Sequence, residues 1–395
     1  MRKNFKKSLF LVSFLSVVMA FNSSIASLQE TDEALKAENF KIDYTDFIFY
    51  KQLKEALKPL ESQNLEKKIA ELSLQAPALK LLNKGQEVLV LKEILSEKGY
   101  LKEDAKTDIF DESLEKAVKI FQRDNSLTQD GIVGRVTKKF LNRSLKSTKE
   151  IIQKNIDRWE KLTSITSKKF IIVNVAAYEV YVFDLEATNG EVKPYFKIDA
   201  IVGRRDRKTP LFFAPLTQVT FNPVWNVPAS IAKKDKFPKI KIDPDYLRRA
   251  HLTVLDSLGS VVDPQDMDLD DFSSYRLRQS SGAYNALGVI KFSLDTLNAI
   301  YMHDTPDKKL FDKQSRALSS GCIRLKEPSK MAQWVLQGTT FENEEVLQKA
   351  IESGKTKTLR PEQPIPVEVV YLTCWVDEKG NLVLSDDPYG YDDKL

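Results

Sequence analysis

The spacing of apolar residues changes near Lys168, and this change constrains the fold more than any other feature of the chain. Before it, apolar positions recur at helical spacing, as at Tyr50, Leu53, Leu57 and Leu60. After it, runs of β-branched and aromatic residues are typical of strands. These runs cover residues 170–175, 179–183, 196–202, 216–221, 299–303 and 366–376. They are too scattered for a parallel doubly wound sheet, so the pattern predicts an α+β, multidomain protein.

The length of the chain agrees with several domains, because 395 residues exceed what one hydrophobic core usually organises. We predict a helical scaffold over 27–77 that continues in 143–166, a small three-helix domain over 78–142, and a β-rich catalytic domain over 167–395. Within the catalytic domain, residues 228–282 form a long, polar, strand-poor stretch. Insertions of this kind usually cover a binding site, so we predict a lid.

The first 26 residues have the layout of a cleaved secretory signal peptide. Four basic residues lie in the first seven positions, Ser8–Ala20 is almost wholly apolar, and Ser24-Ile25-Ala26 offers a cleavage site after Ala26. An uncleaved anchor would need roughly 20 apolar residues. Export to the periplasm is therefore expected, and cleavage takes the formal net charge from +4 to about zero. Such a chain has no electrostatic reason to bind nucleic acid or an anionic membrane.

One cysteine and one histidine, from a chain with only two of each, stand near the C-terminal end. His303 precedes Cys322 by nineteen positions, and the polar segment between them can fold back and bring the two side chains together. An imidazole beside a thiol is the arrangement of a general base and a nucleophile. Gly321 lets a carbonyl approach the backbone, whose amides would stabilise an oxyanion. Ser320 can hydrogen-bond near the thiolate, and Arg324 can bind a carboxylate.

Several simpler interpretations compete with a cysteine nucleophile. Cys322 and Cys374 could form a disulfide bond, which exported proteins often contain. Cys322 could equally be a buried thiol that never meets His303. A zinc peptidase lacks ligands, because His251 is the only other histidine and is expected on the lid surface. A serine D,D-transpeptidase would need Ser-Asp-Asn and Lys-Thr-Gly motifs, which do not occur.

The segment around Cys322 resembles the catalytic motif of the L,D-transpeptidases, cysteine enzymes that cross-link peptidoglycan. Members carry a histidine on a strand, a loop, and then Ser/Thr-His/Ser-Gly-Cys-Ile/Val-Arg/Asn. This chain matches with His303 and with Ser319-Ser320-Gly321-Cys322-Ile323-Arg324. The resemblance implies that Cys322 is acylated, that His303 is the general base, and that Ser320 and Gly321 complete the catalytic loop. Ser320 stands where many relatives have a second histidine.

Further motifs resemble the large Gram-negative branch of that family. They are Asn222-Pro223-x-Trp225, Asp243-Pro244-x-Tyr246-Leu247, Asn285-x-Leu287-Gly288-x-x-Lys291-Phe292 and Tyr389-Gly390-Tyr391-Asp392. The resemblance implies substrate-binding roles for Arg324, Asn285, Trp225 and Tyr301, with packing as the alternative for Trp225. The stretch 78–142 resembles a three-helix peptidoglycan-binding domain, through Gly99-Tyr100 and Asp130-Gly131-x-Val133-Gly134.

The reaction implied by the resemblance joins two stem peptides of peptidoglycan in a 3→3 cross-link through a Cys322 thioester. The expected partners are a tetrapeptide donor and a diaminopimelate acceptor, with enzymes of cell-wall synthesis as further candidates, and no cofactor or metal is expected. Carboxypeptidase activity, tethering of a protein lysine and exchange with a free D-amino acid use the same thioester. A non-catalytic peptidoglycan-binding scaffold is the alternative from a different class.

Overall fold

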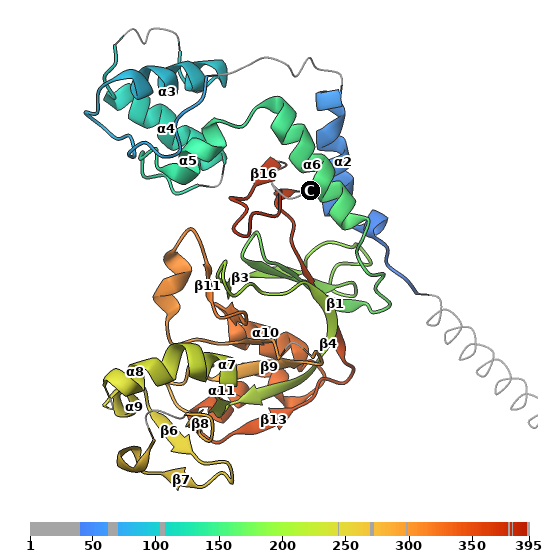
Figure 1. Cartoon of the computed structure of the whole chain (residues 1–395). Helices are drawn as coiled ribbons and strands as arrows, with labels where there is room; N and C mark the ends of the chain where they lie inside the picture. Colours follow the sequence, from blue (N-terminus) through green and yellow to red (C-terminus); the bar gives the residue numbers. More distant parts are fainter. Residues whose placement is uncertain are drawn as a thin grey trace, which may run out of the picture. The chain divides into compact units, whose positions relative to one another are not determined.

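The computed structural model describes residues 40–61, 70–102, 107–125, 127–243, 245–268, 272–297, 299–377, 380 and 382–392 (Figure 1). The expected signal peptide and the first part of the expected scaffold lie outside these residues. Within the described residues, no helix is both long and apolar enough to cross a membrane. Residues 40–43 and 164–167 form a small separate unit, in which Ile42 and Ile165 pair as an antiparallel bridge.

Two helices form the scaffold part, α2 (Ile48–Glu61) and α6 (Leu145–Trp159). They pack against each other through the faces that the spacing predicted, with Leu53 and Ile152 fully buried. Ser144 caps α6, because its side chain accepts a hydrogen bond from the Ser147 amide. A short 3-10 turn, Tyr44–Asp46, precedes α2.

The small domain consists of α3 (Gln86–Glu97), α4 (Glu112–Asp124) and α5 (Arg135–Leu141). Its core includes the predicted apolar positions of all three helices. Asp111 caps α4, since its carboxylate accepts from the Leu114 amide at 2.8 Å.

A large sheet forms the framework of the C-terminal domain. Its strands are β1 (Lys169–Asn174), β2 (Glu179–Asp184), β3 (Phe196–Gly203), β4 (Phe212–Phe221), β9 (Ile290–Leu294), β10 (Tyr301–His303), β11 (Ala317–Ser319), β12 (Ile323–Leu325), β13 (Lys357–Leu359) and β14 (Ile365–Val370). Among the described residues, the strand order is β11-β3-β12-β10-β9-β4-β14-β1-β2, and β2 also pairs with β3. The sheet therefore closes on itself. Mixed helix and sheet, with the helical domain first, confirms the predicted α+β class.

The core of this domain follows from the alternation of side chains along each strand. The inward positions of the closed sheet, such as Val173, Phe292 and Ile323, are all fully buried. Helices α10 (Pro328–Val335) and α11 (Glu344–Glu352) add Trp334 and Leu347 to the same cluster. The catalytic motif thus lies on strands whose opposite face is anchored in a packed core.

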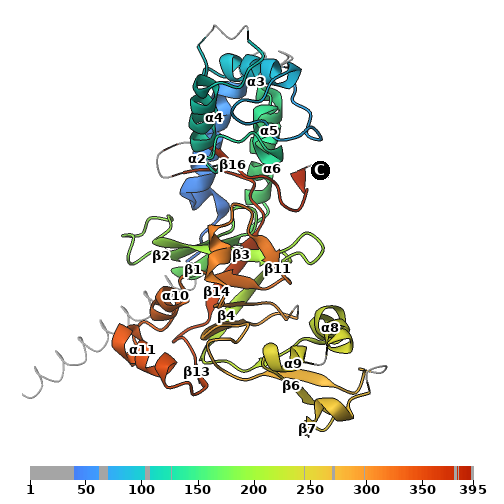
Figure 2. The same cartoon turned by 90° about the vertical axis from the view of Figure 1, so that its left-hand side faces the viewer.

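The predicted lid, residues 228–282, has a core of its own and more regular structure than its sequence suggested (Figure 2). Its elements are α7 (Ala229–Ile231), the π-helix η2 (Ala232–Lys236), α8 (Phe237–Ile242), α9 (Tyr246–Arg249), β6 (Leu252–Leu255), β7 (Val261–Val262), a 3-10 turn (Pro264–Asp266) and β8 (Arg276–Gln279). Together with β5 (Trp225–Asn226) the strands form a sheet in the order β5-β8-β6-β7. This stretch was expected to be strand-poor, and its strands β6, β7 and β8 are short, with four, two and four residues.

The expected strand over 366–376 is divided into β14 and β15 (Cys374–Val376), and β15 pairs with β16 (Leu382–Leu384). Asn174 causes the break, because its side chain hydrogen-bonds to the backbone N–H and carbonyl of Leu372. Cys374 is fully buried, and both it and Cys322 are free thiols, so the disulfide alternative is not realised.

Candidate active site

The register of β10 and β12 brings the cysteine and histidine motifs together. The two strands pair in parallel, with Met302 opposite Ile323 and His303 opposite Arg324. Met302 and Ile323 point into the core, where both are fully buried. Because side chains alternate along a strand, His303 and Arg324 project from the other face.

The same alternation places Tyr301, two residues before His303, and Cys322, two residues before Arg324, on that outer face. Tyr301 hydrogen-bonds to the Cys322 thiol through its backbone N–H and through its hydroxyl group. His303 is the next outward residue along β10, so it lies diagonally across the strand pair from Cys322.

A third strand adds a cation that the sequence analysis did not assign to the site. Strand β9 pairs with β10 so that Lys291 lies opposite His303. Lys291, His303 and Arg324 therefore form a row across three neighbouring strands, which are about 4.8 Å apart. Lys291 is part of the motif Asn285-x-Leu287-Gly288-x-x-Lys291-Phe292, but the sequence did not show that this residue pairs with His303 on the neighbouring strand.

Burial dominates the protonation of Cys322. It raises the pKa of the thiol above its ordinary value, although the bonds from Tyr301 and the charges of Arg324 and Lys291 lower it. A thiol with such a pKa stays protonated near neutral pH. A nucleophilic role for Cys322 would therefore require a base that takes the thiol proton at the moment of attack.

His303 is 4% exposed, and its pKa is lowered to about 3. Burial is the main cause, and the charges of Arg324 and Lys291 add to it; the carbonyl oxygens of Asp304 and Leu287, which favour a protonated ring, act in the opposite direction. The ring is therefore neutral. Its Nδ1 lies against the Asp304 carbonyl oxygen, which accepts only from an N–H, so the proton of the neutral ring belongs on Nδ1.

The loop before Cys322 is fixed by hydrogen bonds to its backbone. The Ser319 hydroxyl donates to the Cys322 carbonyl and accepts from the Gly321 amide at 3.1 Å. Gly321 has a φ of 121°, which favours glycine. The Gly321 amide was expected to donate to an oxyanion; its bond to Ser319 leaves the Cys322 amide as the nearer candidate.

A turn between β3 and β4, residues 204–209, supports this loop from outside. Thr209 is 1% exposed, and its hydroxyl donates to the Gly321 carbonyl at 2.7 Å and accepts from the Gly203 amide at 2.9 Å. Tyr389, from the C-terminal segment, accepts from the Thr209 amide at 2.9 Å and donates to the Gly203 carbonyl at 2.6 Å. The catalytic loop thus depends on residues far from it in the sequence.

Arg324 has unused capacity to bind an anion. Its Nη1 lies 3.4 Å from the Thr305 hydroxyl oxygen and 3.8 Å from a carboxylate oxygen of Asp307. Its Nε is buried and has no hydrogen-bond partner among the described residues. A half-buried guanidinium with an unsatisfied donor suits a carboxylate ligand.

The other two residues predicted to bind substrate, Trp225 and Asn285, have different surroundings in the structure. Trp225 is 7% exposed, packs in the lid core and hydrogen-bonds to the Tyr301 side chain, so it positions the residue that contacts the thiol. Asn285 is fully buried, and its amide nitrogen donates to the carbonyl oxygens of Pro223 and Ser280 while its oxygen accepts from Leu287. These backbone partners place the Asn285 side chain in the framework at the base of the lid, while its expected role in substrate binding stays a prediction.

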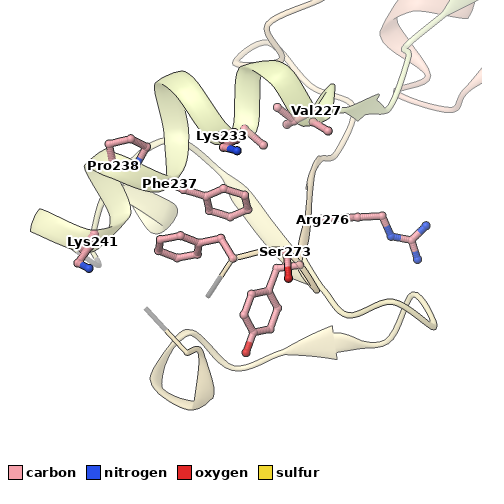
Figure 3. Close-up of a pocket in the computed structure, with 11 residues that line it drawn as sticks. Val227, Lys233, Phe237, Pro238, Lys241, Ser273 and Arg276 are labelled. Atoms are coloured by element: carbon pink, nitrogen blue, oxygen red, sulfur yellow. The ribbon is translucent and has the colours of Figure 1, made fainter. Parts of the chain in front are cut away.

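A cavity of about 700 Å³ lies within the lid and is separate from this cluster (Figure 3). Phe237 points into it, its ring stacked on Phe272 at 4.4 Å, while Arg276 extends away (Figure 3). Neither Cys322 nor His303 lines it. His251, as expected, is exposed on the lid, where its ring stacks on Tyr284.

Two family models match this chain. Residues 168–346 match the model of the L,D-transpeptidase catalytic domain. Residues 84–141 match the "Putative peptidoglycan binding domain". Both matches lie inside the predicted catalytic and three-helix segments.

A protein of Haemophilus influenzae named "Putative L,D-transpeptidase" is 36% identical over 228 residues, which are 57% of this chain and 45% of that protein. The chain thus covers about half the length of this relative. Among solved structures, an L,D-transpeptidase from Stackebrandtia nassauensis is 11% identical, with 76% of this chain and 97% of that chain covered and a TM-score of 0.25. The L,D-transpeptidase from Mycobacterium smegmatis is 13% identical, with 51% and 58% covered and a TM-score of 0.23.

Proposed function

Because residues 168–346 match the model of the L,D-transpeptidase catalytic domain, we propose that the protein is a peptidoglycan L,D-transpeptidase that forms 3→3 cross-links. One observation carries the proposal: Tyr301, His303, Cys322 and Arg324 project from one face of two paired strands. Lys291 extends the same row on the next strand. A thiol, a neutral imidazole and two cations on one surface are what acyl transfer from a carboxylate-bearing peptide requires.

In the first step, Nε2 of neutral His303 accepts the Cys322 proton as the sulfur attacks the carbonyl between the L-centre and the D-residue of a stem tetrapeptide. The C–N bond then breaks, the imidazolium gives its proton to the leaving amine, and D-alanine departs. A thioester remains on Cys322. The bond from His303 Nδ1 to the Asp304 carbonyl supports this assignment, because it keeps the second ring nitrogen unprotonated.

Charge develops on the sulfur and then on the carbonyl oxygen, and we assign its stabilisation to neighbouring groups. Arg324 and Lys291 lower the pKa of the Cys322 thiol and so favour the thiolate. The Cys322 amide is our candidate oxyanion donor, and one such donor contributes roughly 3–4 kcal/mol to the transition state. The accessible part of the half-buried Arg324 guanidinium would hold a carboxylate of the peptide.

In the second step, the side-chain amine of diaminopimelate on another stem attacks the thioester, and His303 takes the amine proton. The sulfur leaves as the thiol and a peptide bond joins the stems. Water in place of the amine gives an L,D-carboxypeptidase, and a protein lysine gives a tethering enzyme. The domain at 84–141 would hold the enzyme on the sacculus, so we place the protein outside the cytoplasm, in the periplasm.

The test uses the mature protein and a disaccharide-tetrapeptide, with products identified by mass spectrometry. We expect a cross-linked dimer that has lost one D-alanine. Cys322→Ala should abolish both the dimer and acylation by a carbapenem while leaving sacculus binding intact. Cys374→Ala is the matched control and should retain activity.

Cross-linking by the Cys322→Ala protein at the wild-type rate would refute Cys322 as the nucleophile. A wild-type protein that forms neither dimers nor hydrolysis products would refute the enzyme and leave the scaffold alternative. Hydrolysis products without dimers would assign the carboxypeptidase reaction instead.

A further inference from the structure

We propose that Arg207 is a positioning residue that latches the lid onto the catalytic loop. Its guanidinium lies between Asp235, in the π-helix of the lid, and Ser320, two residues before Cys322. The catalytic part of this inference rests on the proposed function, whereas the lid contact itself does not.

The lid side of the latch is a two-pronged ion pair. Arg207 Nη2 donates to one carboxylate oxygen of Asp235 at 2.7 Å, and Nη1 donates to the other. Such paired bonds fix both distance and orientation. The Arg207 side chain is 16% exposed and the Asp235 side chain 29%. The pKa of Asp235 is lowered chiefly by its hydrogen bond to Arg207, and Arg204 lies 4.0 Å from the same carboxylate.

The catalytic side of the latch is the hydrogen bond from Arg207 Nη1 to the Ser320 hydroxyl oxygen at 3.3 Å. Because Ser320 accepts this bond, its own hydrogen is directed away from the guanidinium. Ser320 also lies beside Gly321, whose carbonyl is held by Thr209 from the same turn as Arg207. The turn therefore holds the loop before the nucleophile at two successive residues.

The backbone of the turn keeps Arg207 in place. The Arg207 amide donates to the Arg204 carbonyl at 2.8 Å, and the Arg204 amide donates to the Ser319 carbonyl at 3.0 Å. Gly203 allows the tight approach, because a Cβ there would lie 2.2 Å from the Arg207 carbonyl oxygen. The guanidinium is thus presented from a rigid base to a lid that folds around a separate core.

The location of Asp235 is also informative. It lies in η2, a π-helical turn between α7 and α8. Such turns are rare in proteins, and many of those that occur lie at functional sites. Closing the lid therefore delivers a carboxylate to Arg207, and opening the lid removes it. Lid position and the hydrogen bonding of Ser320 are coupled through one side chain.

Asp235→Asn removes the charge of the latch with little change in shape. We expect amide hydrogen exchange in residues 229–242 to accelerate about five- to tenfold, because the lid opens more often. We also expect KM for the tetrapeptide donor to rise about fivefold, with a smaller fall in kcat. Arg207→Lys keeps the charge but loses the two-pronged geometry, and should give an intermediate exchange rate.

A matched control exists inside the lid. Arg249 and Asp243 form another arginine–aspartate pair that does not reach the catalytic loop. Asp243→Asn should therefore leave exchange in 229–236 within about twofold of wild type. Combining Arg207→Asp with Asp235→Arg should restore slow exchange in the lid but not the donor to Ser320, so catalysis should recover only in part.

The proposal is overturned if the amides of residues 229–236 exchange at the same rate in Asp235→Asn and in Asp243→Asn. It is also overturned if the double variant Arg207→Asp/Asp235→Arg fails to slow this exchange although its melting temperature matches that of wild type. Exchange is measured without substrate. A wild-type protein that lacked transpeptidase activity would therefore refute the proposed function and leave the latch to stand or fall on the exchange rates.

Discussion

The hydroxyl of Tyr389 offers the sharpest test of how the catalytic loop is supported. Tyr389 is 1% exposed, and its hydroxyl bonds to the amide of Thr209 and the carbonyl of Gly203. Tyr389→Phe removes one oxygen atom and leaves both backbone groups buried without that partner. Each such group costs about 1–3 kcal/mol, so with about 1.5 kcal/mol for each of the two groups we expect a loss of about 3 kcal/mol in the free energy of unfolding.

The size of the catalytic domain determines how far this loss of free energy lowers the melting temperature. For domains of 150–250 residues, 1 kcal/mol corresponds to about 2–4 °C, so Tyr389→Phe should melt about 6–12 °C below wild type. The assay is thermal unfolding followed by circular dichroism. Carbapenem acylation below the transition should also slow, because Thr209 holds the Gly321 carbonyl next to the nucleophile.

Tyr391→Phe is the matched control, two residues away in the same segment. Tyr391 packs its ring on Tyr371 and lies 4.1 Å from the Lys208 ammonium, contacts that phenylalanine retains. We expect it to change stability by about 0.5 kcal/mol or less. If the two variants melt together, the hydroxyl of Tyr389 does not support the loop and the reasoning fails.

Three further predictions follow from single side chains. Because the pKa of His303 is about 3, carbapenem acylation should not fall between about pH 8 and pH 5; an inflection near the ordinary histidine pKa of about 6.5 would contradict this. Burial raises the pKa of Glu368 to about 7, so the folded state holds that proton more tightly and loses stability as the pH rises from 4.5 to 7. Urea denaturation should therefore show that Glu368→Gln is about 1–3 kcal/mol more stable than wild type at about pH 8 but not at about pH 4.5. Gly203→Ala places a Cβ 2.2 Å from the Arg207 carbonyl oxygen and should lower the free energy of unfolding by about 3 kcal/mol or more. A Cβ at Gly134 meets no atom within 4 Å, so Gly134→Ala should not destabilise the protein, and equal melting temperatures of the two variants would refute the clash.

The sequence predicted the parts of the fold that local spacing encodes. The helical spacing before Lys168 and the strand-like runs after it depend on residues within one or two turns or strands of each other. The division of the strand after Val370 was not predictable, because it depends on Asn174, 198 residues away from Leu372 in sequence.

The candidate site shows the same limit. Cys322 and His303 were found from residue type and motif, and their common face follows only from a strand register that no local pattern encodes. Thr209 is 112 residues from Gly321 and 180 residues from Tyr389, so its contribution was invisible in the sequence. Asn285 shows the opposite case: its residue type suited a ligand, but the sequence did not reveal that its side chain is buried among backbone partners at the base of the lid.

The protonation states of the pair explain why a lid belongs to this site. Burial keeps both Cys322 and His303 neutral, although Lys291 and Arg324 favour the thiolate. A buried neutral thiol is a poor target for oxidants and a weak nucleophile until a base takes its proton. Proton transfer therefore becomes favourable only when a bound carbonyl accepts the charge as it forms. A lid that closes over the bound peptide excludes water from the site. Without water, the two cations interact more strongly with the developing negative charge, and the thioester is protected from hydrolysis. On this argument, loosening the Arg207–Asp235 contact should shift the products from cross-linked dimer toward hydrolysed tripeptide, and an unchanged product ratio in Asp235→Asn would contradict it.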